Sequence, residues 1–149
     1  MGSASSRLPV TSTLDVRASQ MQLPDRDAAF LQERSFEYEL VDEGGMLCVL
    51  IKGWGLPEGY TVASADLLLR LSPGYPDVPP DMWWFEPALV RLDGGAIQAT
   101  EVTETVLGRS WQRWSRHLDA TLWNSGTDGL ESYFSLVHRE VAAGAGALV

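Results

Sequence analysis

Apolar and polar residues alternate along the stretch FEYEL, in which Phe36, Tyr38 and Leu40 share one side of an extended chain. Glu37 and Glu39 share the other side, and this period of two is typical of a half-buried strand. A Gly-Gly pair then predicts a hairpin turn into MLCVLIKG, which is apolar on both sides and indicates a central strand. SADLLLRLS repeats this pattern, and DMWWFEPAL is a fourth candidate. We therefore expect a four-stranded antiparallel meander.

Helical spacing precedes and follows these strands. DRDAAFLQER offers Asp25 as an N-cap and predicts a short helix. In TDGLESYFSLVHREVAAG, Asp128 is a candidate N-cap with Glu131 three residues on. We expect an α+β fold in which this last segment is a helix that covers the sheet. Its apolar residues at helical spacing are Leu130, Tyr133, Phe134, Val137 and Val141.

Between about Leu89 and Asn124 the chain shows neither period. Irregular stretches of more than roughly 12 to 15 residues in a compact domain are usually functional or disordered, and three tryptophans here argue against disorder. We expect a long loop that carries any chemistry. The ends predict a flexible N-terminal segment at 1–22, a folded domain at 23–143 and a flexible tail at 144–149.

Composition narrows the classes of function. The 149 residues suffice for one domain, and a formal net charge of −9 with 11 scattered Lys and Arg excludes nucleic acid as an expected partner. The chain has no apolar run of about 18 residues and no secretory signal, so we expect a cytoplasmic protein without a membrane partner. With a single cysteine and two distant histidines, we expect neither a metal site nor a cofactor.

Residue types that take part in nucleophilic and acid–base chemistry gather in RWSRHLDATLW, residues 113–123: Ser115, Arg116, His117 and Asp119. They also have a structural interpretation. Ser115 then caps a turn, Arg116 pairs with a surface carboxylate, and His117 closes a hydrogen bond.

The stretch LLLRLSPGYPDVPPDMWWF resembles the strand and proline-fixed turn of ubiquitin-conjugating enzymes. GLPEGY, YPDVPPDMWWFEPAL, WQRWSRH and the tryptophan before GTDGLESYF are similar to a bacterial branch, prokaryotic family E, over about residues 36–141. The resemblance implies a UBC-like fold with an N-terminal helix, a four-stranded antiparallel meander, a long active-site loop and a C-terminal helix. It also implies a ubiquitin-like modifier, a ThiF-type activating enzyme and a deconjugating protease as partners, in systems of which some serve in phage defence.

The chain departs from that family at the nucleophile. Ubiquitin-conjugating enzymes carry the modifier as a thioester on a cysteine after the meander, and this chain has none there. Cys48 falls in the second predicted strand, where a buried cysteine acts as a small hydrophobe. The family's His-Pro-Asn motif is also missing. In these enzymes a tryptophan follows the cysteine by eight residues, and counting back eight from Trp123 leads to Ser115.

A serine at the cysteine position implies an oxyester. A hydroxyl is a weak nucleophile unless a base takes its proton and a donor receives the oxyanion charge. His117 and Arg116 suit these roles by type. In an extended segment, Ser115 and His117 would share a face, and Asp119 would continue it as an orienter of the histidine.

Three functions remain open. A transferase passes the modifier from Ser115 to an amine or hydroxyl, whereas a catalytically inactive adaptor of the same fold docks the activating enzyme or the modifier. A hydrolase using Ser115 and His117 is disfavoured because no Gly-x-Ser-x-Gly elbow is present. Arg109 and Arg113 are candidates for binding an acidic surface of the modifier.

Overall fold

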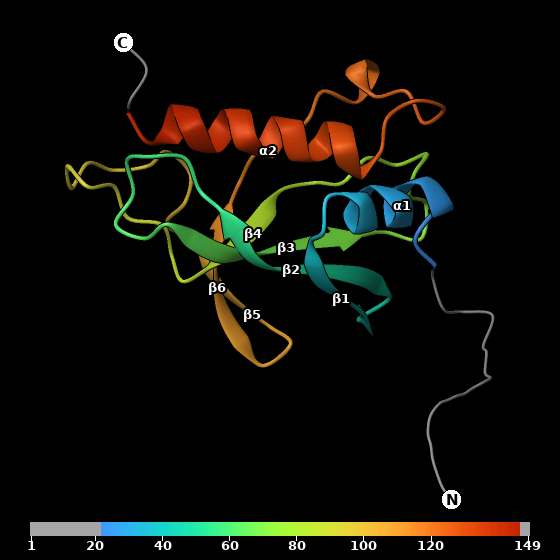
Figure 1. Ribbon diagram of the computed structural model, residues 1–149, viewed down its shortest axis with the longest axis horizontal. Helices are drawn as coiled ribbons and strands as arrows, with labels where there is room; N and C mark the ends of the chain where they lie inside the picture. The colour runs from blue at the N-terminus through green and yellow to red at the C-terminus, as the bar shows by residue number, and fades with distance from the viewer. Residues whose placement is uncertain (1–21, 147–149) are drawn as a thin grey trace, which may run out of the picture.

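A computed structural model describes residues 22–146, which form one six-stranded antiparallel sheet with α2 across one face and α1 beside the edge strand β1 (Figure 1). The strand order is β1-β2-β3-β4-β6-β5. The segments 1–22 and 144–149 lie largely outside the described residues. The elements are α1 Asp25–Glu33, β1 Glu37–Glu43, β2 Met46–Gly55, β3 Ser64–Leu71, β4 Trp83–Glu86, β5 Thr103–Val106, β6 Arg109–Trp114, the 3-10 helix η2 Ala120–Leu122 and α2 Leu130–Gly144.

The expected meander is confirmed as β1 to β4. Gly44 and Gly45 join β1 to β2 with φ of 62° and 81°, the left-handed conformation that a two-residue hairpin turn requires. β2 is an interior strand, buried along most of its length. Leu40 departs from the expected alternation and is 42% exposed, because β1 is an edge strand and α2 covers the middle of the sheet.

The expectation that residues 89–124 are irregular throughout is wrong. β5 and β6 form a hairpin within this segment, and β6 pairs with β4, which extends the sheet from four strands to six. Leu107 and Gly108 make the turn with φ of 55° and 73°. Leucine rarely adopts a positive φ, so the sequence at this turn carried no usual hairpin signal.

The main core fills the space between the sheet and α2. Apolar side chains from β2, β3 and β4 meet those of α2, which stabilises the fold by removing their surface from water. Aromatic rings dominate the contact: Trp83 stacks on Trp114 at 6.2 Å between centroids, and Phe30 meets Phe134 edge-on at 5.4 Å. The five apolar positions predicted for the closing helix are all buried: Leu130, Tyr133, Phe134, Val137 and Val141.

Both predicted N-caps are wrong. Asp25 is the first residue of α1, which starts directly after Pro24, and Asp128 accepts a hydrogen bond from the Asn124 backbone N–H instead of capping α2. The α2 cap comes from Asp27, whose carboxylate accepts from the Leu130 backbone N–H at 2.9 Å. A helix start leaves several backbone N–H groups unpaired, and a carboxylate from a neighbouring helix satisfies one of them.

Asp27 also fixes the turn after β3. Its other oxygen accepts a hydrogen bond from the Tyr75 hydroxyl at 2.6 Å, and the residue is 2% exposed. Burial, reinforced by this bond, raises the pKa of Tyr75, so the phenol remains a donor. A Cβ at Gly129 would lie 2.6 Å from Asp27 Oδ1, which explains why a glycine precedes α2. Asp27 thus ties α1, the turn after β3 and the start of α2 together.

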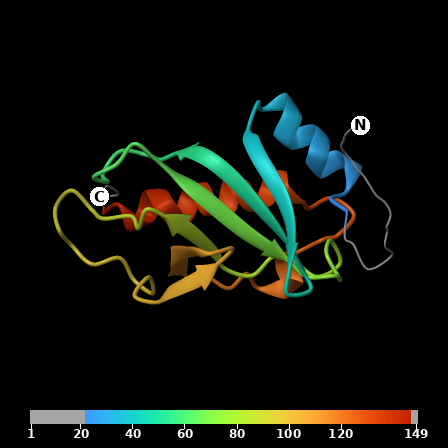
Figure 2. The ribbon, with the colours of Figure 1, turned by 90° about the horizontal axis from the view of Figure 1, so that it is seen from below.

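The face of the sheet opposite α2, visible in Figure 2, has no helix over it within residues 22–146. Its apolar centre is a small cluster of buried residues from five strands. Four sets of ion pairs involve side chains on β1 to β6: Lys52–Glu39, Arg70–Glu43, Arg113–Glu104, and Arg109 with both Asp66 and Glu86. We call this surface the open face; its cluster consists of Cys48, Leu50, Leu68, Trp84, Val106 and Trp111.

Candidate functional site

Ser115 is the first residue after β6. The preceding Trp114 is fully buried against Trp83 and fixes the direction in which the chain leaves the sheet. The backbone N–H of Ser115 donates to the carbonyl of Ala99 at 3.0 Å, so the residue is held from both sides. The proposed nucleophile therefore lies on a well-anchored segment.

The side chain of Ser115 has an arginine as its partner. Arg113 Nε donates to Ser115 Oγ at 3.0 Å, and Arg113 Nη1 donates to Glu104 Oε2 at 3.2 Å. Glu104 is held in turn by Trp84 Nε1 at 2.7 Å. A hydrogen bond from a cation favours negative charge on the accepting oxygen, and Ser115 keeps its own proton available for donation. Arg113 was expected only as a contact for a modifier, and no local sequence signal indicated its bond to Ser115.

His117 also has an unexpected partner. Its Nδ1 lies 2.7 Å from Asp81 Oδ1, and the two side chains are 67% and 58% exposed. Asp81 comes close because the backbone N–H of the next residue, Met82, donates to the carbonyl of Arg116 at 3.1 Å. Asp81 lies 36 residues away in the sequence, so spacing alone did not point to it.

Asp119 does not orient His117. Its Oδ1 accepts from the Thr121 backbone N–H at 3.0 Å and from the Thr121 hydroxyl at 2.8 Å, which caps η2. These bonds from Thr121 lower the pKa of the Asp119 carboxyl. The expectation that Asp119 positions the histidine is therefore wrong, and Asp81 has that place.

Arg116 is directed towards α2. Its Nε donates to Glu140 Oε1 at 3.1 Å, its Nη1 donates to the carbonyl of Gln98 at 2.8 Å, and its guanidinium carbon lies 4.8 Å from the ring centroid of Trp114. These contacts match the structural interpretation, in which Arg116 pairs with a carboxylate. The guanidinium of Arg116 thus connects the loop before β5, at Gln98, to helix α2, at Glu140.

Two pairs result: Ser115 with Arg113, and His117 with Asp81. Among residues 22–146, no hydrogen bond joins Ser115 to His117. A cavity of about 250 Å³ on the open face is lined by Asp81, the partner of His117, and by Glu104, which accepts from Arg113. Its remaining wall is mixed apolar and polar, formed by Met46, Arg70, Ser72, Val78, Pro79, Met82 and Trp84.

Cys48 lies within β2 and is fully buried, as the sequence predicted. Two strands, β3 and β4, separate β2 from β6 in the sheet. Burial is the main cause that raises the pKa of the Cys48 thiol, so the reactive thiolate is disfavoured there. This cysteine is thus distant from the segment that carries Ser115.

In the part of the chain that the structure describes, no three His, Cys, Asp or Glu side chains are placed to hold a metal ion. Neither of its α-helices is long and apolar enough to cross a membrane.

Comparison with protein families gives one assignment. The family model described as prokaryotic E2 family E matches residues 23–144, most of the chain. The protein belongs to this family. Neither the curated proteins nor the solved structures give a match.

Membership agrees with the observed α+β architecture and places the protein among those with functions related to ubiquitin conjugation. E2-like proteins work in general with a modifier and an activating enzyme. The segment matched to the family includes Ser115 and His117 together with their partners, Arg113 and Asp81.

Proposed function

We propose that this protein accepts a ubiquitin-like modifier from a ThiF-type activating enzyme as an oxyester on Ser115 and transfers it to a target. The observation that carries the proposal is the hydrogen bond from Arg113 Nε to Ser115 Oγ, at the end of β6 in a member of an E2 family. A guanidinium at this oxygen stabilises the negative charge that develops on it whenever the ester bond forms or breaks.

In the first step, Ser115 Oγ attacks the carbonyl carbon of the thioester that joins the modifier to the activating enzyme. A C–O bond forms and the C–S bond breaks. His117 takes the serine proton and returns it to the leaving thiolate. With Nδ1 bonded to Asp81, the imidazole keeps Nε2 for this proton, and the carboxylate stabilises the cation that forms.

In the second step, an amine or hydroxyl of the target attacks the oxyester carbonyl. The new bond to the target forms as the C–O bond to Ser115 breaks, and the proton released by the acceptor returns to Ser115 Oγ through His117. Arg113 holds the departing oxygen. We place the protein in a system that also contains a deconjugating protease.

An inactive adaptor is the second candidate. It is favoured by the lack of a hydrogen bond between Ser115 and His117 within residues 22–146 and by the high exposure of the His117–Asp81 pair. An adaptor would bind the activating enzyme or the modifier through the same surface without forming an adduct.

Intact-mass measurement after incubation with the activating enzyme, the modifier and ATP separates the two candidates. The wild type should gain the mass of one modifier, in a bond that survives thiols and is cleaved by hydroxide. Ser115→Ala should remove the adduct, and Ser115→Cys should give one that thiols cleave. Ser110→Ala is the matched control, because Ser110 is an exposed serine on the same hairpin and should leave the adduct unchanged.

His117→Ala should slow adduct formation by roughly 100-fold if His117 is the general base. An adduct that persists in Ser115→Ala would assign the chemistry to another residue. If the activating enzyme forms its own thioester with the modifier but never loads this protein, and binding is retained, the adaptor is correct.

A further inference from the structure

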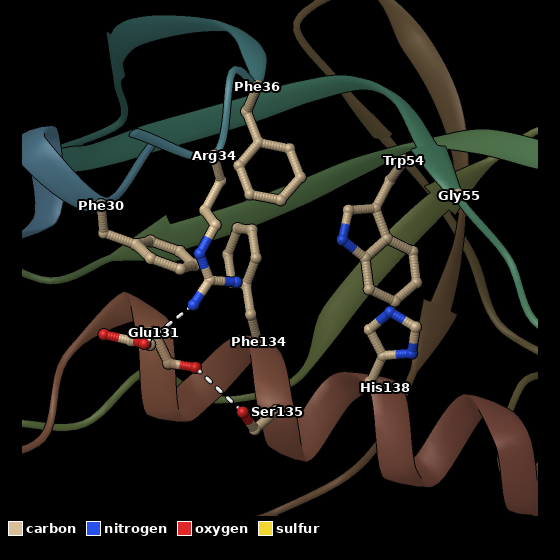
Figure 3. A pocket seen from close by; sticks show the side chains of 9 residues that line it. All are labelled: Phe30, Arg34, Phe36, Trp54, Gly55, Glu131, Phe134, Ser135 and His138. Atoms are coloured by element: carbon tan, nitrogen blue, oxygen red, sulfur yellow. Dashed lines mark hydrogen bonds and ion pairs between the residues drawn. The ribbon is translucent and has the colours of Figure 1, made fainter. Parts of the chain in front are cut away.

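On the helix-covered side of the sheet, a cavity of about 450 Å³ opens between α1, the start of β1, the end of β2 and α2 (Figure 3). It is separate from Ser115, whose side-chain partner Arg113 lies on the open face. Phe36 and Phe134 form one wall, and Trp54 with His138 forms the other, at 4.7 Å between the ring centroids of the last two. The volume lies within the range of about 300 to 1,000 Å³ typical of small-ligand sites.

Trp54 places an unused donor in this cavity. The residue as a whole is 2% exposed, but its indole Nε1 is not among the buried unpaired polar atoms of residues 22–146, which are Arg70 Nε and Trp83 Nε1; this N–H is therefore reached by solvent in the cavity and bonds no group of the described chain. Figure 3 shows the indole nitrogen on the side of the ring that faces Phe134. A donor that faces the cavity and has no protein partner among the described residues is free to bond an acceptor atom of a ligand there.

The polar groups around the cavity are mostly donors. Arg34 Nη2 donates to Glu131 Oε2 at 2.9 Å, and the remaining N–H groups of Arg34 bond no other side chain in the described chain. The imidazole of His138 likewise has no hydrogen bond within residues 22–146. The cavity lining contains one carboxylate, Glu131, and it already accepts a hydrogen bond from Arg34. An ionised carboxylate only accepts hydrogen bonds and therefore complements this excess.

We propose that this cavity binds a carboxylate attached to an apolar group. The apolar group lies between Phe134 and Trp54, and the carboxylate accepts from Trp54 Nε1–H and from Arg34. This site is independent of the transfer reaction proposed for Ser115, so either can fail without the other.

The indole N–H resonances of ¹⁵N-labelled protein provide the test, since each of the six tryptophans has its own signal. Titration with N-acetyl-phenylalanine should move the Trp54 signal, which the variant Trp54→Phe identifies. N-acetyl-phenylalaninamide, equal in shape but neutral, should bind at least about tenfold more weakly. An unchanged Trp54 signal with the acid, or equal binding of acid and amide, would overturn the proposal.

Two surface variants test the charges with opposite signs. Arg34→Gln should weaken binding of the acid about fivefold or more, because it removes a donor and leaves Glu131 unpaired. Glu131→Gln should strengthen it, because it frees Arg34 and removes a repelling charge. Arg139→Gln is the matched control: it removes the same charge as Arg34→Gln from an exposed position that does not line the cavity. If all three variants behave alike, the carboxylate does not occupy this cavity.

Comparing a peptide with a small acid tells whether the bound carboxylate is a peptide C-terminus or belongs to a free small molecule. Acetyl-Gly-Gly-Phe has the same final residue as N-acetyl-phenylalanine, on a longer chain. Tighter binding of the tripeptide would identify the C-terminus of a peptide as the ligand, and equal or weaker binding would identify a free small acid; either result requires the same carboxylate chemistry.

Discussion

The two faces of the sheet differ in how they bury their side chains. Under α2, aromatic and aliphatic groups fill a continuous core, and one buried carboxylate, Asp27, serves as a cap for that helix. On the open face, six buried residues form a narrow cluster, and arginines and lysine paired with carboxylates surround it. Apolar burial stabilises the first face, whereas partly exposed ion pairs contribute little to stability.

The comparison explains where the candidate chemistry lies. A residue committed to the helix-covered core cannot be exchanged without a large cost in free energy, but paired charges on the open face can be reoriented or desolvated by a partner at small cost. Arg113 is an example: it pairs with Glu104 on the open face and also donates a hydrogen bond to Ser115.

The largest effect should come from the helix-covered face. Phe134→Ala removes a ring that is 4% exposed and contacts both Phe30 and Phe36, so it should lower the free energy of unfolding by about 3 to 5 kcal/mol, measured by urea denaturation. Leu92→Ala, at a leucine 70% exposed, is the control and should change it by less than about 0.5 kcal/mol. A loss below about 1 kcal/mol for Phe134→Ala would mean that α2 contributes little to the core.

Periodicity explains why this face was predictable. The apolar positions of α2 repeat at helical spacing, so the sequence contains the information on which side is buried, and all five expected residues are buried. The same holds for β2 and β3, whose continuous apolar runs predict interior strands with side chains buried on both faces of the sheet. The N-cap of α2 was not predictable from local sequence, because it comes from Asp27, more than a hundred residues away.

The open face was harder to predict because its pairs join distant strands. Ser115 was found by a count from Trp123, and its partner Arg113 lies two residues before it, whereas the histidine's partner Asp81 lies 36 residues away and comes close only because β6 pairs with β4. That pairing was hidden by a Leu-Gly turn with no usual hairpin signal. Sequence therefore supplied the candidate residues, and the fold supplied their partners.

An intermediate effect is expected at Cys48, in the apolar centre of the open face. Because the thiol is fully buried and burial raises its pKa, a thiol reagent should label it only as the protein unfolds. Cys48→Ala should cost about 1 to 2 kcal/mol for a small cavity, measured by denaturation. Modifier loading by this variant should match the wild type; loss of loading by a folded variant would refute the assignment to Ser115.

The smallest effect is expected for the ion pairs, and its pH dependence identifies its origin. Burial alone would raise the pKa of Asp66, but hydrogen bonds from Arg109 and from the Gly53 backbone N–H outweigh it and lower the pKa. A carboxyl with a lowered pKa in the folded state stabilises the fold above its unfolded pKa of about 3.9, and this stabilisation is lost as the pH falls through the lower folded value. Asp66→Asn keeps an oxygen for Gly53 but removes the charge and replaces the oxygen that accepts from Arg109 with an NH₂ group, so the cost at pH 7 should be about 1 kcal/mol.

The difference between wild type and Asp66→Asn should therefore be constant near neutral pH and begin to shrink as the pH falls below about 4. It should close only below the lowered folded pKa, where the carboxyl of the folded wild type also becomes neutral. Asp42→Asn is the control, because Asp42 is exposed on β1 and forms no ion pair within residues 22–146. The test is to measure the unfolding free energies of wild type, Asp66→Asn and Asp42→Asn from pH 3 to pH 7. A cost for Asp66→Asn as large at pH 3 as at pH 7 would mean that packing, not charge, holds this part of the open face, and the contrast between the two faces would not hold there.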